Sequence, residues 1–313
     1  MANEAQAIAG AAPAGDGWAM PPETPCRVAL ARLARRNPVG VVALLVVVAF
    51  CALGLAQVVS QDIFGTALAP YDPQDIQAQD QFQGPSWEHP FGTNQRGNDM
   101  FSRVLAGTRI SFLIGLMAVT VGFIPGALLG IASGYYQRWL DYVIQRSAEA
   151  WASFPVIFLY LALITAFGRG LQTIAIVIII SSVFGGSRVL RAAALVMKQN
   201  DFVEASRATG ASELRILFHH NVPHVMPIII VGASSVFAIS VLTESALSFL
   251  GIGVDPGTPS WGIDLFEGLD NARFFPYLVI FPGIAISLVV LGFNLLGDTL
   301  RDVLDPRLRG QLG

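Results

Sequence analysis

Charged residues, and lysine above all, are scarce in this chain of 313 residues. Charged side chains make up 13% of the sequence and hydrophobic ones 53%. Lys198 is the only lysine, and Gln199 follows it. The phosphate-binding loop of many nucleotide hydrolases needs a lysine followed by serine or threonine, so this chain cannot contain that loop. If ATP drives a process here, another polypeptide binds the ATP.

Cysteine and metal-ligand patterns are scarce as well. Cys26 lies in a polar leading segment and Cys51 lies within an apolar run, so we expect no disulfide between them. His220 and His224 would share one face of a continuous helix, but Pro223 separates them, and we expect an interface role rather than a metal site. A net charge of −3 offers no basic surface for nucleic acid. We therefore expect no metal, no other cofactor and no nucleic-acid partner.

Long apolar runs are what the sequence has in abundance. The mean hydropathy is +0.58. Charges leave gaps of about twenty residues, which is the length that a helix rising 1.5 Å per residue needs to cross a hydrocarbon core of roughly 30 Å. The sequence predicts an all-α polytopic membrane protein with six transmembrane helices. We expect these spans at about residues 39–60, 110–133, 150–167, 171–184, 225–247 and 276–296. A short polar turn (Gln137, Arg138, Asp141) is expected before the third span, and the fourth is expected to continue as helix from Gly185 into the cytosol.

Composition also divides the chain along its length. Residues 1–26 are rich in alanine, glycine and proline, which predicts a disordered N-terminus. Residues 27–84 are expected to hold the first span and a polar, acidic extracytoplasmic segment, and residues 85–313 a core domain. Arginines before the first run also fit a signal peptide, but the run is longer than a typical signal core, so we expect a retained span. In the second span, Pro125 between glycines predicts a kink, and small residues predict close helix contact.

The longest polar interval of the second half, residues 200–223, predicts two short helices joined by a glycine. Asp201 and Glu204 fit a capping box, so a helix can begin there. Gly210 can adopt the left-handed backbone conformation that ends a helix. The interval therefore predicts a stiff elbow outside the membrane, suited to docking another protein.

The second helix of this elbow has its own signals. Ser212 can cap its start, and Pro223 is expected to end it. Leu214, Leu217 and Phe218 would lie along one side.

The same stretch carries a family resemblance. Glu204-Ala205-Ser206, then Gly210, then Val222-Pro223, resembles the EAA loop of permease subunits in ATP-binding-cassette importers. That family usually has a second alanine at Ser206 and an isoleucine at His220. In the family this loop enters a groove on a cytosolic ATPase, and the alternative is an ordinary amphipathic connector in which Glu204 only caps its own helix. The resemblance implies ATPase-coupling roles for Glu204, Ala205, Ser206, Gly210, Leu214, Leu217, Phe218 and Pro223.

Three further motifs resemble the dipeptide and oligopeptide branch of these permeases. The first, HPFGTNQRGNDM at 89–100, departs from the branch pattern GTDxxGRD because Asn94 and Asn98 replace the acid and the arginine. The second, LSFLGIGVDPGTPSWG at 247–262, is rich in glycine and proline and predicts a re-entrant or capping loop. The third, GDTLRDVLDPRLR at 297–309, predicts a short cytosolic helix ending at Asp305-Pro306. The long outside segment before the first motif resembles the C-type subunit.

The resemblance implies the type I importer permease fold, a non-catalytic subunit and a set of partners. These are a B-type permease subunit, two ATP-binding-cassette subunits (separate or fused) that hold ATP and magnesium, and an extracytoplasmic binding protein. The implied cargo is a dipeptide or oligopeptide, with a nickel chelate or glutathione as alternatives. An ion-coupled secondary carrier would need coupling residues at the midplane and usually a broken-helix repeat. An intramembrane enzyme would need a nucleophile and base, or a metal set, at one depth.

Positive charges predict the orientation. With both termini in the cytosol, 14 of the 19 lysines and arginines lie in cytosolic segments, as the positive-inside rule requires. The five outside are Arg96, Arg103, Arg109, Arg169 and Arg273. We expect a bacterial inner-membrane protein whose elbow faces the cytosol.

Three ionisable residues of the expected spans need separate treatment. Glu244 lies late in the fifth span, where a charge at mid-bilayer costs about 2.5–3.5 kcal/mol on insertion scales. It either lines the pathway or pairs with an arginine at a subunit contact, or it lies shallow enough to be wetted. Glu149 and Arg188 are expected near membrane edges as structural anchors.

Overall fold

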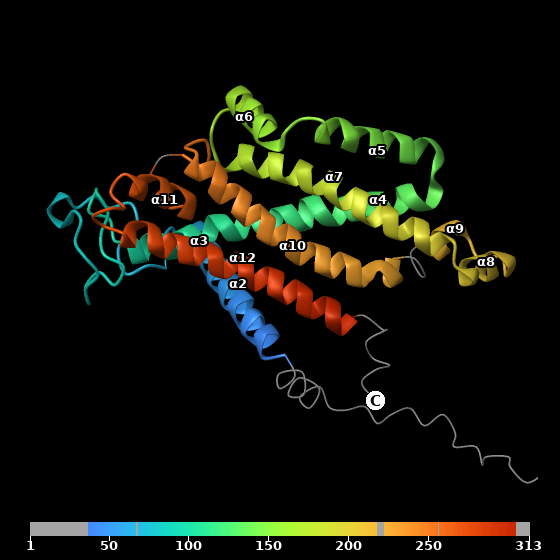
Figure 1. Cartoon of the computed structure of the whole chain (residues 1–313), viewed down its shortest axis with the longest axis horizontal. Helices are drawn as coiled ribbons and strands as arrows, with labels where there is room; N and C mark the ends of the chain where they lie inside the picture. The colour runs from blue at the N-terminus through green and yellow to red at the C-terminus, as the bar shows by residue number, and fades with distance from the viewer. Residues whose placement is uncertain (1–36, 67, 218–221, 256, 305–313) are drawn as a thin grey trace, which may run out of the picture. The chain divides into compact units, whose positions relative to one another are not determined.

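The computed structural model describes residues 37–66, 68–217, 222–255 and 257–304, and nearly all of their regular structure is helical (Figure 1). The described residues from 39 onward form one compact unit. In chain order, the elements are α2 (Pro38–Phe64), the 3₁₀ turn η1 (Ala78–Asp80), α3 (Met100–Met117), the π-helical η2 (Ala118–Phe123), α4 (Ile124–Tyr136), α5 (Arg138–Ala152), α6 (Val156–Phe167), α7 (Leu171–Lys198), α8 (Asp201–Ala208), α9 (Glu213–Ile216), α10 (Val222–Phe249), α11 (Trp261–Leu269) and α12 (Tyr277–Leu304).

Five helices within these ranges are long and apolar enough to cross a membrane, and a bent pair makes a sixth if it counts as one span. The five are Pro38–Phe64, Met100–Tyr136, Leu171–Lys198, Val222–Phe249 and Tyr277–Leu304. They confirm the first, second, fourth, fifth and sixth expected spans. As expected, α7 continues past residue 184 as the same helix.

The third expected span was wrong as a single helix over 150–167. Two helices meet there at 90°, and the second, α6, has only 12 residues. At 1.5 Å per residue α6 is about 18 Å long, too short to cross a membrane. Pro155 explains the break, because it lacks an N–H and disfavours a helical conformation at Phe154 before it. Of the residues expected to form a polar turn, Arg138 and Asp141 belong instead to the 15-residue helix α5, and only Gln137 lies between α4 and α5.

A stripe of four glycines, Gly122, Gly126, Gly130 and Gly134, packs the second span against α7. A Cβ on Gly126 would lie 2.2 Å from the carbonyl oxygen of Val183, and one on Gly130 would lie 2.3 Å from that of Ser187. Both are far inside van der Waals contact, so the two backbones can approach only because these side chains are absent. This confirms the expected close helix contact.

Around Pro125 the helix changes type rather than stopping. The six residues of η2 precede the proline, and the Ile124 N–H bonds the Val119 carbonyl five residues back. A π-helical turn holds one extra residue per turn, which accommodates a proline that cannot donate a hydrogen bond. The second span therefore stays continuous from Met100 to Tyr136.

An aromatic cluster joins the first span to the rest of the bundle. Phe50 of α2 lies 6.0–6.3 Å, between ring centroids, from Phe112, Phe237, Trp261 and Phe293 of four other helices. Its edge-to-face contacts with Phe112, Phe237 and Phe293 add to the stabilisation from burial.

The last helix differs from the expectation of a separate short cytosolic helix. Residues 297–304 continue α12 without a break, because no proline lies among them and the single glycine, Gly297, is tolerated inside a helix. The expected end at Asp305-Pro306 lies outside the described residues.

Candidate functional site

The elbow between α7 and α10 has the helix–glycine–helix form predicted for it. Gly210 has a φ of +81°, and the Ala211 N–H donates to the Ser206 carbonyl at 3.1 Å. A left-handed glycine with this six-residue hydrogen bond is the Schellman end of a helix. Gly210 thus ends α8 and sets the direction of the chain toward α9. Figure 1 shows α8 and α9 at the end of the bundle where α7 ends.

The second helix of the elbow is shorter than expected. The Ser212 hydroxyl accepts the Arg215 N–H at 3.4 Å, a long contact in the capping position, and α9 covers only four residues. The prediction that Pro223 ends this helix was wrong, because Pro223 lies in the first turn of α10. Proline is tolerated there, since the first N–H groups of a helix have no acceptor within it.

The apolar side of the elbow is fixed to the bundle. Val203 and Ile216 are fully buried and Leu217 is 5% exposed. They pack in one cluster with Tyr135 of α4 and Leu190 of α7. Leu217 is therefore an anchor inside this chain, so a partner contact through it would require the elbow to move.

A polar contact adds to this anchoring. The Tyr135 hydroxyl donates to the Glu213 carboxylate, and the Lys198 ammonium lies 5.8 Å from the Tyr135 ring centre. The only lysine of the chain thus lies beside the base of the elbow.

The opposite side of the elbow is exposed and polar. Glu204, Gly210 and Arg215 are exposed there, and Ser206 is half-buried. The side chains of Asp201, Ala205 and Leu214, and the residues Phe218 and His220, lie outside what the structure describes. The Asp201–Glu204 capping box therefore stays a prediction.

An ion pair that the sequence analysis missed joins α5 to α7 near the elbow. Arg191 donates through Nε and Nη2 to the two Asp141 carboxylate oxygens, at 2.5 and 2.7 Å. Ser133 of α4 also donates to Asp141 at 2.5 Å. The sequence predicted Asp141 in a turn. Only the helical spacing of α5 could have indicated that the Asp141 side chain faces α7.

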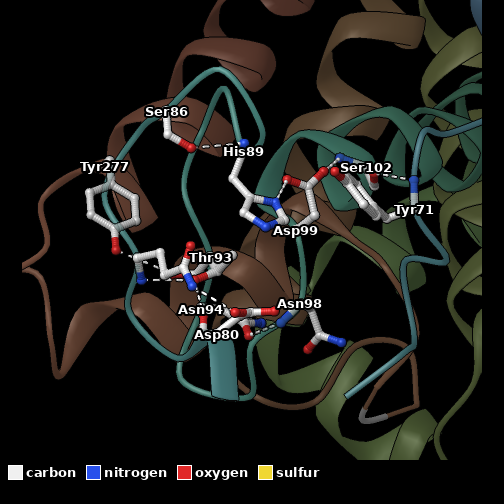
Figure 2. A network of polar contacts seen from close by, with 11 residues as sticks. Tyr71, Asp80, Ser86, His89, Thr93, Asn94, Asn98, Asp99, Ser102 and Tyr277 are labelled. Atoms are coloured by element: carbon white, nitrogen blue, oxygen red, sulfur yellow. Dashed lines mark hydrogen bonds and ion pairs between the residues drawn. The ribbon is translucent and has the colours of Figure 1, made fainter. Parts of the chain in front are cut away.

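The segment before α3 is folded around a buried polar network (Figure 2). The Asp99 carboxylate accepts the Ser102 N–H at 2.7 Å, which caps α3, and lies 2.9 Å from His89 Nδ1. Ser102 Oγ accepts the Tyr71 N–H at 3.1 Å. Asp99 thus fixes both the start of α3 and the loop beside it.

The two asparagines that depart from the branch pattern belong to the same network. Asn94 Oδ1 accepts the N–H groups of Arg96 and Asn98, at 2.9 and 3.0 Å. Asn98 Nδ2 donates to the Asp75 carbonyl at 2.5 Å. Both side chains are buried, so the amides hold this turn by hydrogen bonds in place of an acid and an arginine.

Glu244 is fully buried near the end of α10. Its carboxylate accepts hydrogen bonds from Ser248 at 2.8 Å and Ser260 at 2.9 Å, and Ser245 lies 3.4 Å away. Ser260 directly precedes α11, so the carboxylate connects α10 to α11. Within the described residues of this chain, serine hydroxyls therefore surround the Glu244 carboxylate, and its role at a subunit contact or in the pathway stays a prediction.

A buried ion pair that the sequence did not indicate joins α3 to α11. Arg103 Nε of α3 donates to Asp264 of α11 at 2.6 Å, and both side chains are at most 2% exposed. Arg103 Nη1 also reaches the Pro73 carbonyl at 3.2 Å. Burial raises the pKa of the Asp264 carboxyl, and the Arg103 guanidinium opposes that shift.

Comparison with known proteins gives the family. The model of the family described as "Binding-protein-dependent transport system inner membrane component" matches residues 126–310. The chain belongs to this family.

Curated relatives of the permease agree. The glutathione transport system permease protein GsiD of Pectobacterium atrosepticum is 40% identical over 243 residues, covering 77% of this chain and 81% of the relative. The dipeptide transport system permease protein DppC of Alkalihalophilus pseudofirmus is 37% identical over 288 residues, 91% of each chain. GsiD of an Escherichia coli strain is 39% identical over 249 residues. The protein is thus a multi-pass permease component of a transport system.

Proposed function

We propose that this chain is the C-type permease subunit of an ATP-driven importer of short peptides. It would form half of a translocation pathway together with a B-type permease subunit. The elbow carries the proposal, because it is fixed to the bundle on one side and polar and exposed on the other. That is the form that a handle for a cytosolic partner requires.

The elbow gives a mechanism for coupling. Two ATP-binding-cassette subunits bind and hydrolyse ATP, since this chain has no phosphate-binding loop. When they close, each pulls on an elbow through residues such as Glu204, Ala205, Ser206 and Gly210. Val203 and Ile216 transmit this movement to α4 and α7, because they are buried against those helices. The pathway then opens to the opposite side, and a substrate released by the extracytoplasmic binding protein passes inward.

The remaining coupling residues are proposed on resemblance alone. Leu214 and Phe218 would contact the ATPase, whereas Leu217 and Pro223 would fix the base of the elbow, in agreement with the burial of Leu217 and the helical position of Pro223. We also retain the proposed division into residues 1–26, 27–84 and 85–313. The cell location follows the same proposal: a bacterial inner membrane, with both termini in the cytosol.

The substrate class rests on the relatives. Their names specify a dipeptide in one case and glutathione in another, and both are short peptides with free carboxylates. We therefore propose a short peptide as cargo, with glutathione or another small solute as the alternative. An ion-coupled carrier is the weaker candidate, because a carrier would use no ATPase partner.

A substitution of Gly210 tests the coupling role. Valine resists a left-handed backbone at a cost of about 1–3 kcal/mol, whereas alanine should be milder. No atom lies within 4 Å of a Cβ at this position, so packing is unaffected and the protein should still insert. We expect Gly210→Val to give normal abundance, weaker co-purification of the ATPases and at least about tenfold lower uptake of dialanine.

The control for this experiment is Gly84→Val, since Gly84 also has open space around its Cβ but lies in the extracytoplasmic segment. It should leave co-purification and uptake unchanged. Unchanged uptake and co-purification in Gly210→Val would exclude the coupling role. Uptake of dialanine driven by an ion gradient without ATP would instead support the carrier.

A further inference from the structure

The break between α5 and α6 is unusual because nothing in the described chain covers it. Residues Ala152, Ser153, Phe154 and Pro155 are all exposed. They connect two helices that meet at 90°. A non-helical backbone at membrane depth is tolerated only where protein or water surrounds it. The depth of this break therefore decides what must lie against it.

Contacts with α7 give that depth. Ser181 Oγ lies 3.3 Å from Trp151 Nε1 before the break and 3.1 Å from the Tyr160 hydroxyl after it. Ser181 is ten residues from Leu171, the first residue of α7 after the α6–α7 turn. At 1.5 Å per residue this is about 15 Å, half of a hydrocarbon core of roughly 30 Å. In the proposed topology the α6–α7 turn lies at the outer edge of the membrane, which puts the break near its middle.

Two charges lie between the break and the inner end of α7. The contacts Asp141–Arg191 and Trp151–Ser181 show that α5 runs antiparallel to α7. Arg146 and Glu149 lie between those two levels, about 15–30 Å along α7. This puts both residues inside the hydrocarbon core, whereas the sequence predicted Glu149 at a membrane edge.

Arg146 and Glu149 form an ion pair at 2.8 Å, with side chains 65% and 56% exposed. Charged side chains at this depth face water or protein, since contact with lipid is costly. A protein interface without water would impose a desolvation cost on this ion pair, whereas water would not, so water is the favoured surrounding.

We propose that the α5–α6 break and the Arg146–Glu149 pair line the water-filled translocation pathway and contact the peptide within it. This rests on the proposed function. A peptide carries an ammonium group at one end and a carboxylate at the other, which match Glu149 and Arg146 respectively. Phe154, 63% exposed in the break itself, offers an apolar contact for a peptide side chain.

Thiol accessibility in the assembled transporter tests the pathway. Ala152→Cys and Ser153→Cys are each made in a chain carrying Cys26→Ala and Cys51→Ala, and the complex is reconstituted in proteoliposomes. The probe is the water-soluble reagent 2-sulfonatoethyl methanethiosulfonate. The control is Val48→Cys of α2, which is also exposed in the isolated chain, at 56%, but lies in an apolar span.

We expect the two test positions to react at least about tenfold faster than the control, because only they contact water. Saturating dialanine should slow this reaction. Rates equal to that of Val48→Cys at both positions would mean that lipid or the partner permease subunit covers the break, and would overturn the proposal. Fast reaction without any protection by dialanine would overturn the peptide contact.

Charge removal gives a second readout. Arg146→Gln and Glu149→Gln should each raise the KM for dialanine about three- to tenfold while leaving ATP turnover without substrate unchanged, as expected for lost substrate binding. The control is Arg109, which is 26% exposed and forms an ion pair with Asp62 away from the α5–α6 break; Arg109→Gln should leave the KM unchanged. An unchanged KM in both test variants would overturn the contact. If the wild-type complex transports no peptide, the proposed function fails, whereas the labelling rates without substrate still test the pathway.

Discussion

The glycine stripe on the second span leaves no room for a side chain between two helix backbones. Gly126 and Gly130 lie against carbonyl oxygens of α7 rather than against side chains, so no rotamer change can make room there. A cost of this kind differs from the usual cost of filling a core, because the neighbour that must move is a helix backbone.

Gly130→Ala should therefore destabilise the protein. The added Cβ would lie 2.3 Å from the Ser187 carbonyl oxygen, and separating the helices should cost about 1–3 kcal/mol. Gly185→Ala on α7 is the matched control, because its Cβ would have nothing within 4 Å and alanine favours a helix. Thermal unfolding of the complex in detergent should show a lower midpoint for Gly130→Ala and an unchanged or higher one for Gly185→Ala. Equal midpoints would contradict the close approach.

At the level of elements, what could be predicted depended on how local the signal was. Apolar runs located five of the spans, because a span is determined by its own composition. Gly210 and its Schellman turn were also predictable, since the signal lies within a few residues. Helix α5 was missed because its charges suggested a polar turn, and its position along α7 depends on partners such as Arg191, which are fifty residues away.

The same distinction explains the candidate sites. The exposed side of the elbow followed from a local motif, but the burial of Leu217 depends on α4 and α7 and could not be predicted. The sequence indicated that Glu244 lies in an apolar span and needs polar surroundings there. The serine hydroxyls that surround it could not be predicted, because one of them, on Ser260, reaches Glu244 only when the loop after α10 folds back.

The segment before α3 allows a prediction at this scale. Gly97 has a φ of +80°, and a Cβ there would lie 1.8 Å from the Gln77 carbonyl oxygen. Gly97→Ala should therefore loosen the turn that holds η1 against the start of α3. Limited proteolysis of the complex in proteoliposomes should cleave the segment at least about threefold faster.

The control for that experiment is Gly84→Ala, in the same segment, where a Cβ has open space. Its cleavage rate should equal that of the wild type. Equal rates for all three proteins would show that the tight turn does not protect the segment.

For the whole molecule, the arrangement of charge predicts the orientation in the membrane. The segment before α3 and the α8–α9 elbow lie at opposite ends of the bundle (Figure 1). In the topology that places the elbow in the cytosol, 14 of the 19 arginines and lysines fall in cytosolic segments of the sequence. The positive-inside rule therefore directs the elbow to the cytosol, which is also the side on which an ATPase could bind it.

Cysteine labelling in intact cells tests this orientation. In a chain carrying Cys26→Ala and Cys51→Ala, Gln79→Cys in η1 should react with a thiol reagent that cannot cross the membrane, and Gln199→Cys after α7 should not. Both side chains are exposed, so a lack of reaction at Gln199→Cys reports the side of the membrane and not burial. Breaking the cells should make Gln199→Cys reactive, which is the control for accessibility. Labelling of Gln199→Cys in sealed cells would reverse the topology, and it would leave the elbow on the side where no ATP-driven partner can reach it.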